Sequence, residues 1–457
     1  MTQQTSHESD ASSQSARPGL YRWYVLIVLT AAYALVHLDG NLPFILIEEI
    51  KADLGISDTM IGIITGPAFA LVYAVSAIPV ATLADRYSRK HIIGFGIILW
   101  SGFTAAGGLA GNGITLMLSR IGVACSESVC TPASHSIIGN YFGEHERAKA
   151  IAIYSLGLVI GGASAIFIGG LLAKYYGWRS AMFLVGIAGM LLSALVIFTV
   201  REPLRTAFGS PEPSVGGVAS EDSLIDMAPG PKANSYREML SDRRILHILL
   251  GGGFLCISFG AGSSWTAAYT IRHFDLDVAT VGMSIGSIGA VVGVIGILIG
   301  GFVGDYLSRK TPGKSFQFLA GALVVLLVVR LMSLNTDSFH LFLFLIGTAT
   351  LIGMCYVAPT YSTPQSFVEP TARSRMAALL VLTLNGFGIA MGAFMSGVMS
   401  DLLNPRFGED ALRISLNIMV AVPVSLSIWQ YWMASRVIRR AFQDGVHRDA
   451  GTDSDAG

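Results

Sequence analysis

Residues 81–90 read ATLADRYSRK, and residues 301–310 read GFVGDYLSRK. Both stretches contain the pattern D-x-x-S-R-K, and each follows directly after a long apolar run. The offset that aligns these two copies also superimposes Gly62 on Gly282. Self-similarity at one fixed offset predicts a chain that is built from two related halves.

Composition indicates a membrane protein. The 457 residues are 52% hydrophobic and only 13% charged, and the formal net charge is zero. A soluble protein is less apolar and more charged than this, and a balanced charge gives no reason to expect a nucleic-acid partner.

The four cysteines lie inside apolar runs without metal-like spacing, so we expect no disulfide framework, metal site or cofactor. They are Cys125, Cys130, Cys256 and Cys355.

Twelve apolar runs are long enough to cross a bilayer as helices, which takes about 20 residues each. Helices are expected because an open strand would leave peptide groups unpaired in lipid. The expected spans are residues 21–46, 59–82, 91–111, 113–138, 148–172, 178–200, 245–270, 279–303, 315–334, 339–362, 375–400 and 412–435. The predicted fold class is therefore an all-α membrane protein of twelve transmembrane helices in two pseudo-symmetric six-helix halves.

The distribution of lysine and arginine predicts the orientation, because positively charged short loops stay in the cytoplasm. Most of the 30 basic residues fall on one side when both termini are cytoplasmic, and both D-x-x-S-R-K loops then face the cytoplasm. We expect five segments. They are a disordered tail (1–20), an N-terminal half (21–200), a flexible linker (201–243), a C-terminal half (244–438) and a C-terminal tail (439–457).

Two halves with a basic loop after the second span of each resemble the major facilitator superfamily, whose signature loop is close to G-x-L-a-D-r-x-G-r-K. Here Ala81 replaces the first glycine of the first copy, and Ser88 and Ser308 replace the later glycine. The stretches H-L-D-G-N-L-P and S-R-I-G-V-A-C-S-E-S are similar to the spinster-like branch, although His37 and the glycine after Asp39 depart from it. The resemblance implies a monomeric multi-pass transporter in a bacterial inner membrane, for an amphipathic or lipid-like solute such as a lysolipid or sphingoid molecule.

The repeated loop is a candidate cytoplasmic gate. A carboxylate beside helix ends can hold a neighbouring helix N-terminus or an arginine, and so can lock one conformation. The basic residues of the loop have a simpler alternative role as a topology signal, but an acid does little to set orientation. The gate candidates are Asp85, Arg86, Arg89, Lys90, Asp305, Arg309 and Lys310.

Three ionisable residues within the spans are candidates for proton coupling, because a charge there must be paired, face a cavity or serve transport. Asp39 and Arg120 each lie about six residues from the outer end of a span, or about 9 Å, and can share a depth. Glu127 follows Arg120 by about two turns on the same face. The alternative is a buried salt bridge that merely joins two helices, and sodium coordination by Asp39 and Asn41 stays open.

The C-terminal half has few membrane charges. Arg330 lies near an outer end, where its side chain is expected to snorkel toward water. The substrate-cavity candidates are Trp265, Tyr269, Tyr356, Thr360, Tyr361 and Asn385, for which packing is an equally good reading. A run of glycines from Gly282 to Gly304 occupies one face of the eighth span and favours close helix packing.

We therefore predict a secondary active transporter that works by alternating access and is driven by protons. The sequence has no P-loop, nucleophile-base-acid arrangement or H-E-x-x-H motif, so neither an ATP-driven pump nor an enzyme is expected. Two alternatives from the same superfamily stay open: a drug exporter, and a small organic anion/proton symporter with Arg120 as the counter-charge. A transporter-like sensor that binds a solute without moving it is the alternative from another class.

Overall fold

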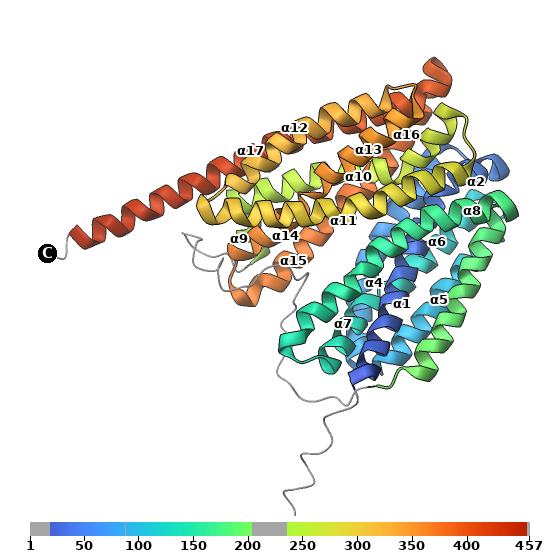
Figure 1. Cartoon of the computed structure of the whole chain (residues 1–457), viewed down its shortest axis with the longest axis horizontal. Coiled ribbons are helices and arrows are strands. Elements are labelled where there is room, and N and C mark those ends of the chain that lie inside the picture. Colours follow the sequence, from blue (N-terminus) through green and yellow to red (C-terminus); the bar gives the residue numbers. More distant parts are fainter. Residues whose placement is uncertain (1–18, 87, 203–234, 455–457) are drawn as a thin grey trace, which may run out of the picture.

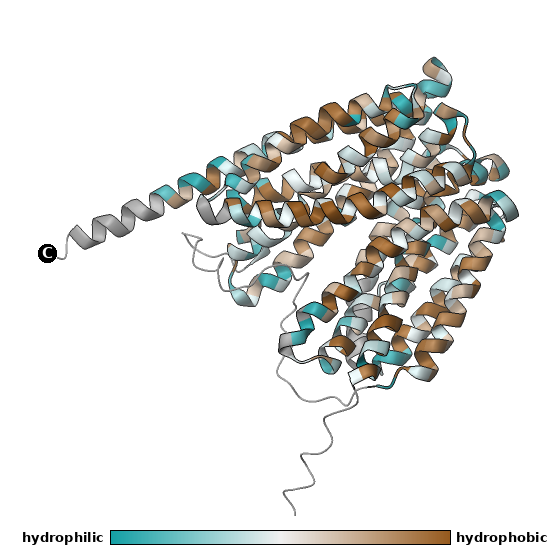
Figure 2. Ribbon diagram, in the orientation of Figure 1, coloured by the Kyte–Doolittle hydropathy of each residue, from teal (hydrophilic) through white to brown (hydrophobic). Residues whose placement is uncertain are grey.

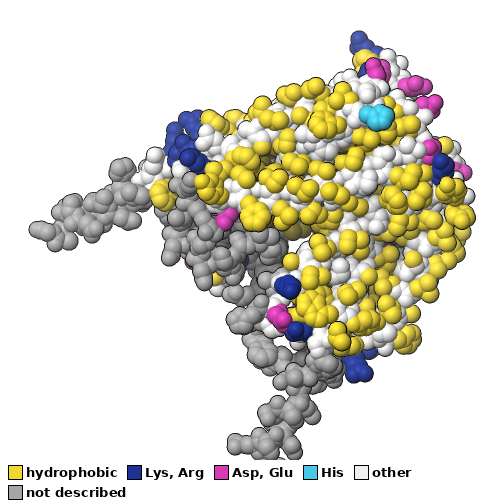
Figure 3. Space-filling view, viewed as in Figure 1, with side chains coloured by type: hydrophobic (Ala, Val, Ile, Leu, Met, Phe, Trp, Pro, Cys, Tyr) yellow, Lys and Arg dark blue, Asp and Glu magenta, His cyan; other side chains and the backbone are white. Residues whose placement is uncertain are grey.

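The computed structural model describes residues 19–86, 88–202 and 235–454, and every regular element in these ranges is a helix (Figure 1). Hydrophobic residues follow the middle of the helices and hydrophilic residues gather at their ends (Figure 2). Large apolar side chains cover the surface, Phe198 and Phe302 being 84% and 76% exposed (Figure 3). A belt of this kind requires a lipid environment, so the chain is a multi-pass membrane protein.

The first half contains eight helices. They are α1 (Gly19–Ile45), α2 (Ile47–Leu54), α3 (Asp58–Thr65), α4 (Pro67–Arg86), α5 (Arg89–Gly107), α6 (Gly113–Glu127), α7 (Cys130–Tyr141) and α8 (Glu144–Thr199). Several expected spans are broken helices: α3 and α4 form the second, and α6 and α7 the fourth. Conversely, α8 combines the fifth and sixth spans. These meet at Gly177, whose φ of 76° lies in the left-handed region that glycine adopts without strain.

The second half begins with α9 (Tyr236–Ser241), α10 (Arg243–Phe274), α11 (Val278–Lys310) and α12 (Lys314–Leu334). It continues with α13 (Phe339–Met354), α14 (Val357–Ser366), η3 (Pro370–Ala372), α15 (Arg373–Val381), η4 (Leu382–Ile389), α16 (Ala390–Phe407), η5 (Gly408–Asp410) and α17 (Ala411–Ser454). Here α13 and α14 form the tenth expected span, and α15, η4 and α16 form the eleventh. The all-α fold with twelve crossings in two halves is confirmed, while the expected linker falls mostly on residues 203–234, outside the described ranges.

The two halves meet at one end of the molecule, where α2 and α3 lie beside α10 and α16, and they diverge toward the end that carries α7 and α9 (Figure 1). We call these the α2 end and the terminal end. Helices α8 and α11 also pack against each other across the halves: a Cβ on Gly282 would lie 2.5 Å from the carbonyl oxygen of Ile166. Only glycine permits this approach of the two backbones.

Candidate functional site

Asp39 and Arg120 meet inside the first half, between α1 and α6. Their side chains are both about 2% exposed, and Nη1 of Arg120 lies 3.4 Å from Oδ1 of Asp39. The second guanidinium nitrogen donates to the main-chain oxygen of Asp39, also at 3.4 Å. Both distances exceed those of a tight charge-assisted hydrogen bond, so the pair is buried but loosely held.

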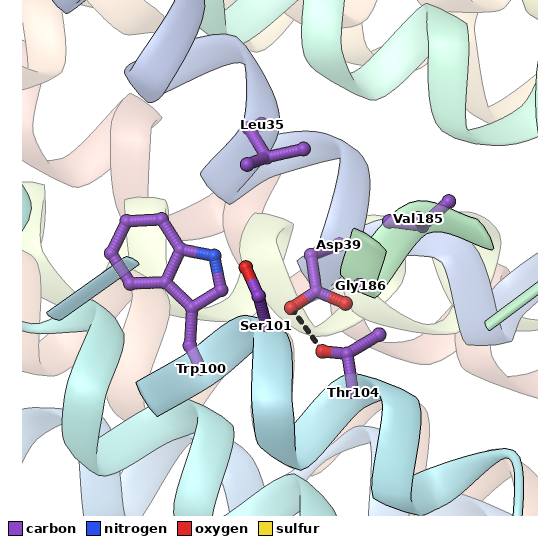
Figure 4. A pocket seen from close by; sticks show the side chains of 7 residues that line it. All are labelled: Leu35, Asp39, Trp100, Ser101, Thr104, Val185 and Gly186. Atoms are coloured by element: carbon purple, nitrogen blue, oxygen red, sulfur yellow. Dashed lines mark hydrogen bonds between the residues drawn. The ribbon is translucent and has the colours of Figure 1, made fainter. Parts of the chain in front are cut away.

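Asp39 has a shorter contact with α5: the hydroxyl of Thr104 donates to its Oδ2 at 2.6 Å (Figure 4). The pocket around this contact is lined by Leu35, Asp39, Trp100, Ser101, Thr104, Val185 and Gly186. Within the described residues, neither the indole nitrogen of Trp100 nor the hydroxyl of Ser101 has a hydrogen-bond partner. Polar groups of α5 thus line the pocket beside the Asp39 carboxyl. We did not expect Trp100, Ser101 and Thr104 from the sequence, although polar residues at helical spacing in an apolar span were the available signal.

Glu127 completes the charged cluster. It is the last residue of α6 and is 1% exposed. Its carboxyl group interacts with that of Asp39, and its Oε1 has no other partner among the described residues. The cluster therefore holds two buried carboxyl groups and a single guanidinium, an arrangement in which a proton on one carboxyl removes the uncompensated negative charge.

Aromatic rings extend from this cluster toward the terminal end. The rings of Tyr33 and Tyr154 stack with centroids 4.5 Å apart, His37 packs edge-on against Tyr33, and His135 packs edge-on against Tyr154. These contacts give both histidines a packing role in the first half. The Nε2 atom of His37 and the hydroxyl of Tyr154 are buried without a hydrogen-bond partner in the described part of the chain.

The first copy of the repeated loop is held by an acid that the sequence did not point to. Glu202, just after α8, accepts hydrogen bonds from the Ser88 hydroxyl at 2.8 Å and from the main-chain nitrogens of Arg89 and Lys90 at 3.1 and 2.9 Å. The carboxylate thereby caps the N-terminus of α5, where free N–H groups favour negative charge. This contact gives Ser88 a reason to replace the usual glycine.

The other gate candidates are less fully described. The side chains of Asp85, Arg86, Arg309 and Lys310 lie outside the described residues, while Asp305 is half-buried near the terminal end of α11. Their gating role stays a prediction.

The substrate-cavity candidates separate into two groups. Trp265 donates to the main-chain oxygen of Ala393, and Tyr269 donates to that of Leu334, so both are satisfied inside the second half. Tyr356 and Thr360 are also buried, with contacts to Cys256 and Tyr431. Tyr361 is half-buried, Asn385 is exposed, and the two side chains contact each other. Of the six candidates, Tyr361 and Asn385 are therefore the two whose side chains are not fully buried.

Arg330 departs from its expected position. Its residue is only 9% exposed, and one guanidinium nitrogen bonds to the hydroxyl of Thr266 on α10 at 2.8 Å. The expectation that this side chain snorkels toward water is wrong, because it turns inward between helices of the second half.

At the α2 end, the halves are joined by a network that we define as Glu48, Lys51, Asp58, Arg272, Ser400 and Asp401. Arg272 on α10 binds both carboxylate oxygens of Asp58 on α3, at 3.0 and 2.9 Å, and its Nη2 lies 2.7 Å from Glu48 on α2. Lys51 adds a second cation 2.7 Å from Asp58. Asp58 is buried, whereas the side chains of Lys51, Arg272 and Glu48 are 21 to 33% exposed, so a buried acid is held here by partly exposed partners.

The same network includes a helix cap that crosses from one half to the other. The Asp401 carboxylate on α16 accepts hydrogen bonds from the main-chain nitrogens of Asp58 and Thr59, at 3.1 and 2.7 Å, at the N-terminus of α3. Ser400 donates to Asp58 at 2.6 Å, and a Cβ on Gly397 would lie 2.3 Å from the Asp58 carbonyl oxygen. The two backbones are in direct contact here. Nothing in the sequence paired these residues, which lie hundreds of positions apart.

A peripheral ion pair also joins the halves at the α2 end. Lys174 lies 3.2 Å from Asp277, and their side chains are 45% and 44% exposed. Hydrogen bonds from Thr280 lower the pKa of the Asp277 carboxyl to about 2, so it is ionised at neutral pH. An exposed pair of this kind contributes little to stability.

No group of histidines, cysteines and acids within the described residues is arranged to hold a metal ion. The four cysteines are free thiols, three of them buried, as core residues would be.

Comparison with known proteins agrees with this architecture. The family model described as the Major Facilitator Superfamily matches residues 29–393. An MFS-type efflux pump of Mycolicibacterium smegmatis is 29% identical over 420 residues, which cover 92% of this chain and 94% of that protein. A probable galactarate/D-glucarate transporter of Bacillus subtilis is 25% identical over 311 residues, or 65% of this chain and 67% of that protein. The solved structure of a bacterial homologue of the human lysosomal transporter Spinster, inward-facing and occupied, has a TM-score of 0.79 at 26% identity, covering 93% of this chain and 99% of that one.

Proposed function

Since this chain belongs to the Major Facilitator Superfamily, a family of membrane transporters, we propose that it moves an amphipathic or lipid-like organic solute by proton-coupled alternating access. Membership confirms the family predicted from the two D-x-x-S-R-K copies, and the Spinster homologue confirms the similarity to the spinster-like branch. The fold is that of transporters and not of enzymes.

The observation that carries proton coupling is the Asp39, Arg120 and Glu127 cluster. Two carboxyl groups and one guanidinium are enclosed together, each residue 2% exposed or less. Because charge in this setting is costly, gain or loss of one proton changes which contacts the cluster favours. A helix that moves when the halves rock would expose or enclose the same carboxyl groups, so proton binding and conformation are linked.

The contacts between the halves support a conformation that opens at the terminal end. We propose that this end is cytoplasmic, because lysine and arginine concentrate there and both termini then lie inside. The chain would face the cytoplasm in this conformation, in a bacterial inner membrane, with the network around Asp58 closing the outer side. In the opposite conformation that network separates and the D-x-x-S-R-K loops close the inner side.

The amphipathic solute rests on the spinster-like similarity and on the apolar character of the spans. Drug export and transport of small organic anions are the alternatives, supported by the efflux pump and the sugar-acid transporter among the relatives. Transport of a small organic anion with Arg120 as its counter-charge is less favoured. Arg120 is already paired with Asp39, so it is not a free counter-charge.

The test uses purified protein in proteoliposomes with an imposed pH gradient and a panel of single-chain lipids, sugar acids and cationic drugs. We expect one class to produce both solute accumulation and proton flux. Glu127→Gln should abolish accumulation while solute exchange continues, because the glutamine keeps shape and hydrogen bonding but binds no proton.

Glu146→Gln provides the matched control, since Glu146 pairs with Arg22 in a partly exposed contact at the terminal end. It should accumulate solute like the parent. Saturable solute binding without any flux in the parent protein would replace transport by the sensor function. Accumulation by Glu127→Gln with unchanged pH dependence would remove Glu127 from the relay.

A further inference from the structure

Arg330 is a buried cation that the proposed proton relay does not use. It lies on α12, four residues before the helix ends at Leu334, and is 9% exposed. Its Nη2 atom donates to the Thr266 hydroxyl at 2.8 Å, and its Nη1 atom has no hydrogen-bond partner among the described residues. The guanidinium therefore has unused donors inside the second half.

Arg330 differs from the other buried arginines of the described ranges in lacking a carboxylate. Arg120 is paired with Asp39, and Arg244 is paired with Asp242, whereas none of the ion pairs among the described residues includes Arg330. A hydroxyl group satisfies one hydrogen bond but does not neutralise the charge. An unpaired ionised group within a membrane protein is expensive and is expected to serve ligand or ion recognition.

Gly262 of α10 lies directly against this guanidinium. A Cβ at this position would lie 3.2 Å from Nη2 of Arg330, closer than an ordinary van der Waals contact, and 3.9 Å from the Thr266 hydroxyl. The glycine is half-buried, and the next residue, Ser263, is exposed. Any side chain at position 262 would press against the charged group, whereas glycine leaves this face of the guanidinium free of a side chain from that position.

We propose that Arg330, Thr266 and Gly262 form an anion subsite that receives the carboxylate or phosphate of the transported solute. This inference rests on the proposed transport function and deepens it, because it assigns an anionic head group to the amphipathic solute. A guanidinium presents parallel N–H donors that match carboxylate and phosphate oxygens. The Thr266 hydroxyl accepts from Arg330 and keeps its own proton for a third contact with the anion.

The binding test compares dodecyl phosphate with dodecanol, which has the same chain without the charge, using the full-length protein in lipid nanodiscs. In the parent, dodecyl phosphate should bind more tightly, and added salt should reduce this advantage. Arg330→Gln should weaken dodecyl phosphate binding by about thirtyfold or more and leave dodecanol unchanged, since loss of one partner of a buried charge pair is severe. Arg330→Lys should retain part of the affinity.

Gly262→Ala gives an independent variant that keeps every charge. It should weaken dodecyl phosphate binding because its methyl group would press against Nη2 of Arg330, and it tests the proposal even if Arg330→Gln does not fold. Equal loss of affinity for both probes in these variants would make Arg330 a packing residue and overturn the proposal. Inorganic phosphate alone, if it binds through Arg330 as tightly as dodecyl phosphate, would identify a free anion as the ligand and overturn the head-group assignment.

Transport measurements separate this inference from the proposed function. If Arg330→Gln still couples proton flux to dodecyl phosphate transport with the parent's affinity, the anion subsite is wrong while proton-coupled transport stands. If the parent binds dodecyl phosphate through Arg330 but no solute drives flux, the transport function is wrong, and with it the subsite's role in a transported solute.

Discussion

At the scale of single residues, the enclosed charges carry the chemistry, and their partners decide what each can do. Arg120 is bonded to Asp39, Asp39 is also bonded to Thr104, and Glu127 keeps one oxygen without a partner within the described chain. A relay needs a site that exchanges a proton as its surroundings change. The loosely held oxygen of Glu127 meets that need better than the more fully bonded carboxylate of Asp39.

The Asp39 and Arg120 pair can be tested by removing its charges singly and together. Arg120→Ala should destabilise the protein by about 3 to 5 kcal/mol, because Asp39 is left as an uncompensated buried charge. Asp39→Asn combined with Arg120→Gln should recover much of this stability without restoring coupling. Thermal unfolding of the purified variants measures the first effect, and proton-driven uptake measures the second. A double variant as unstable as Arg120→Ala would show that charge compensation is not the cause.

At the scale of elements, the glycines of α11 differ in packing: some contact a neighbouring helix closely and others contact none. Gly282 packs against α8, and Gly300 packs so closely on the turn between α13 and α14 that a Cβ would lie 2.4 Å from the backbone of Cys355. Gly289 and Gly293 face space with no atom within 4 Å of a Cβ. The close helix packing expected from the run of glycines between Gly282 and Gly304 is thus found toward both ends of this glycine stripe. In its middle, at Gly289 and Gly293, no neighbouring helix is in contact.

Substitution along this stripe gives a matched prediction. Gly300→Ala should destabilise the protein by about 1 to 3 kcal/mol, as overpacking of a close contact does, because backbone atoms cannot yield as a side chain can. Gly289→Ala should be neutral or slightly stabilising, since alanine favours the helix and meets open space. Unfolding midpoints of both variants in the same nanodiscs check the difference. Equal destabilisation would mean that the middle of the stripe is also packed in the dominant conformation.

The repeated loop belongs to the same scale, because it joins two helices in each half. Asp85→Asn should leave the protein folded and inserted but shift its resting conformation and slow transport, and Asp305→Asn should have a milder effect. Cysteine-accessibility labelling at both ends, together with transport rate, measures the two changes. Unchanged labelling and rate in Asp85→Asn would end its gating role, and larger damage at Asp305 would reverse the ranking.

At the scale of the whole molecule, the network around Asp58 joins the two halves at the α2 end, and we infer that it holds this end closed. It combines two cations, the Asp58 and Glu48 carboxylates and an inter-half helix cap around the buried Asp58 side chain. Because these contacts join helices of the first half to helices of the second, closure of the α2 end depends on both halves. Opening must break several contacts at once.

Asp58→Asn should therefore shift the population toward the conformation that opens at the α2 end, by at least about tenfold, because a buried ion pair loses one partner. Spin-label distances between α2 and α16 report the change. Asp277→Asn is the control: it removes the exposed pair with Lys174, worth about 1 kcal/mol or less, and should leave the distances close to those of the parent. An equal response to both changes would show that burial of the Asp58 contacts is not what closes this end.

The sequence by itself determined the class of molecule. Apolar runs of bilayer length, two copies of D-x-x-S-R-K at one offset and the distribution of lysine and arginine are local or periodic signals, so they survive without any three-dimensional information. The shared depth of Asp39 and Arg120 also followed from counting helical rise along two spans. Tertiary structure alone decided contacts between distant segments: Glu202 with the Ser88 loop, Arg272 with Asp58, and the burial of Arg330 beside Thr266. Those depend on how helices rotate and pack against one another, and a pattern within one helix does not specify which side chain of another it will meet.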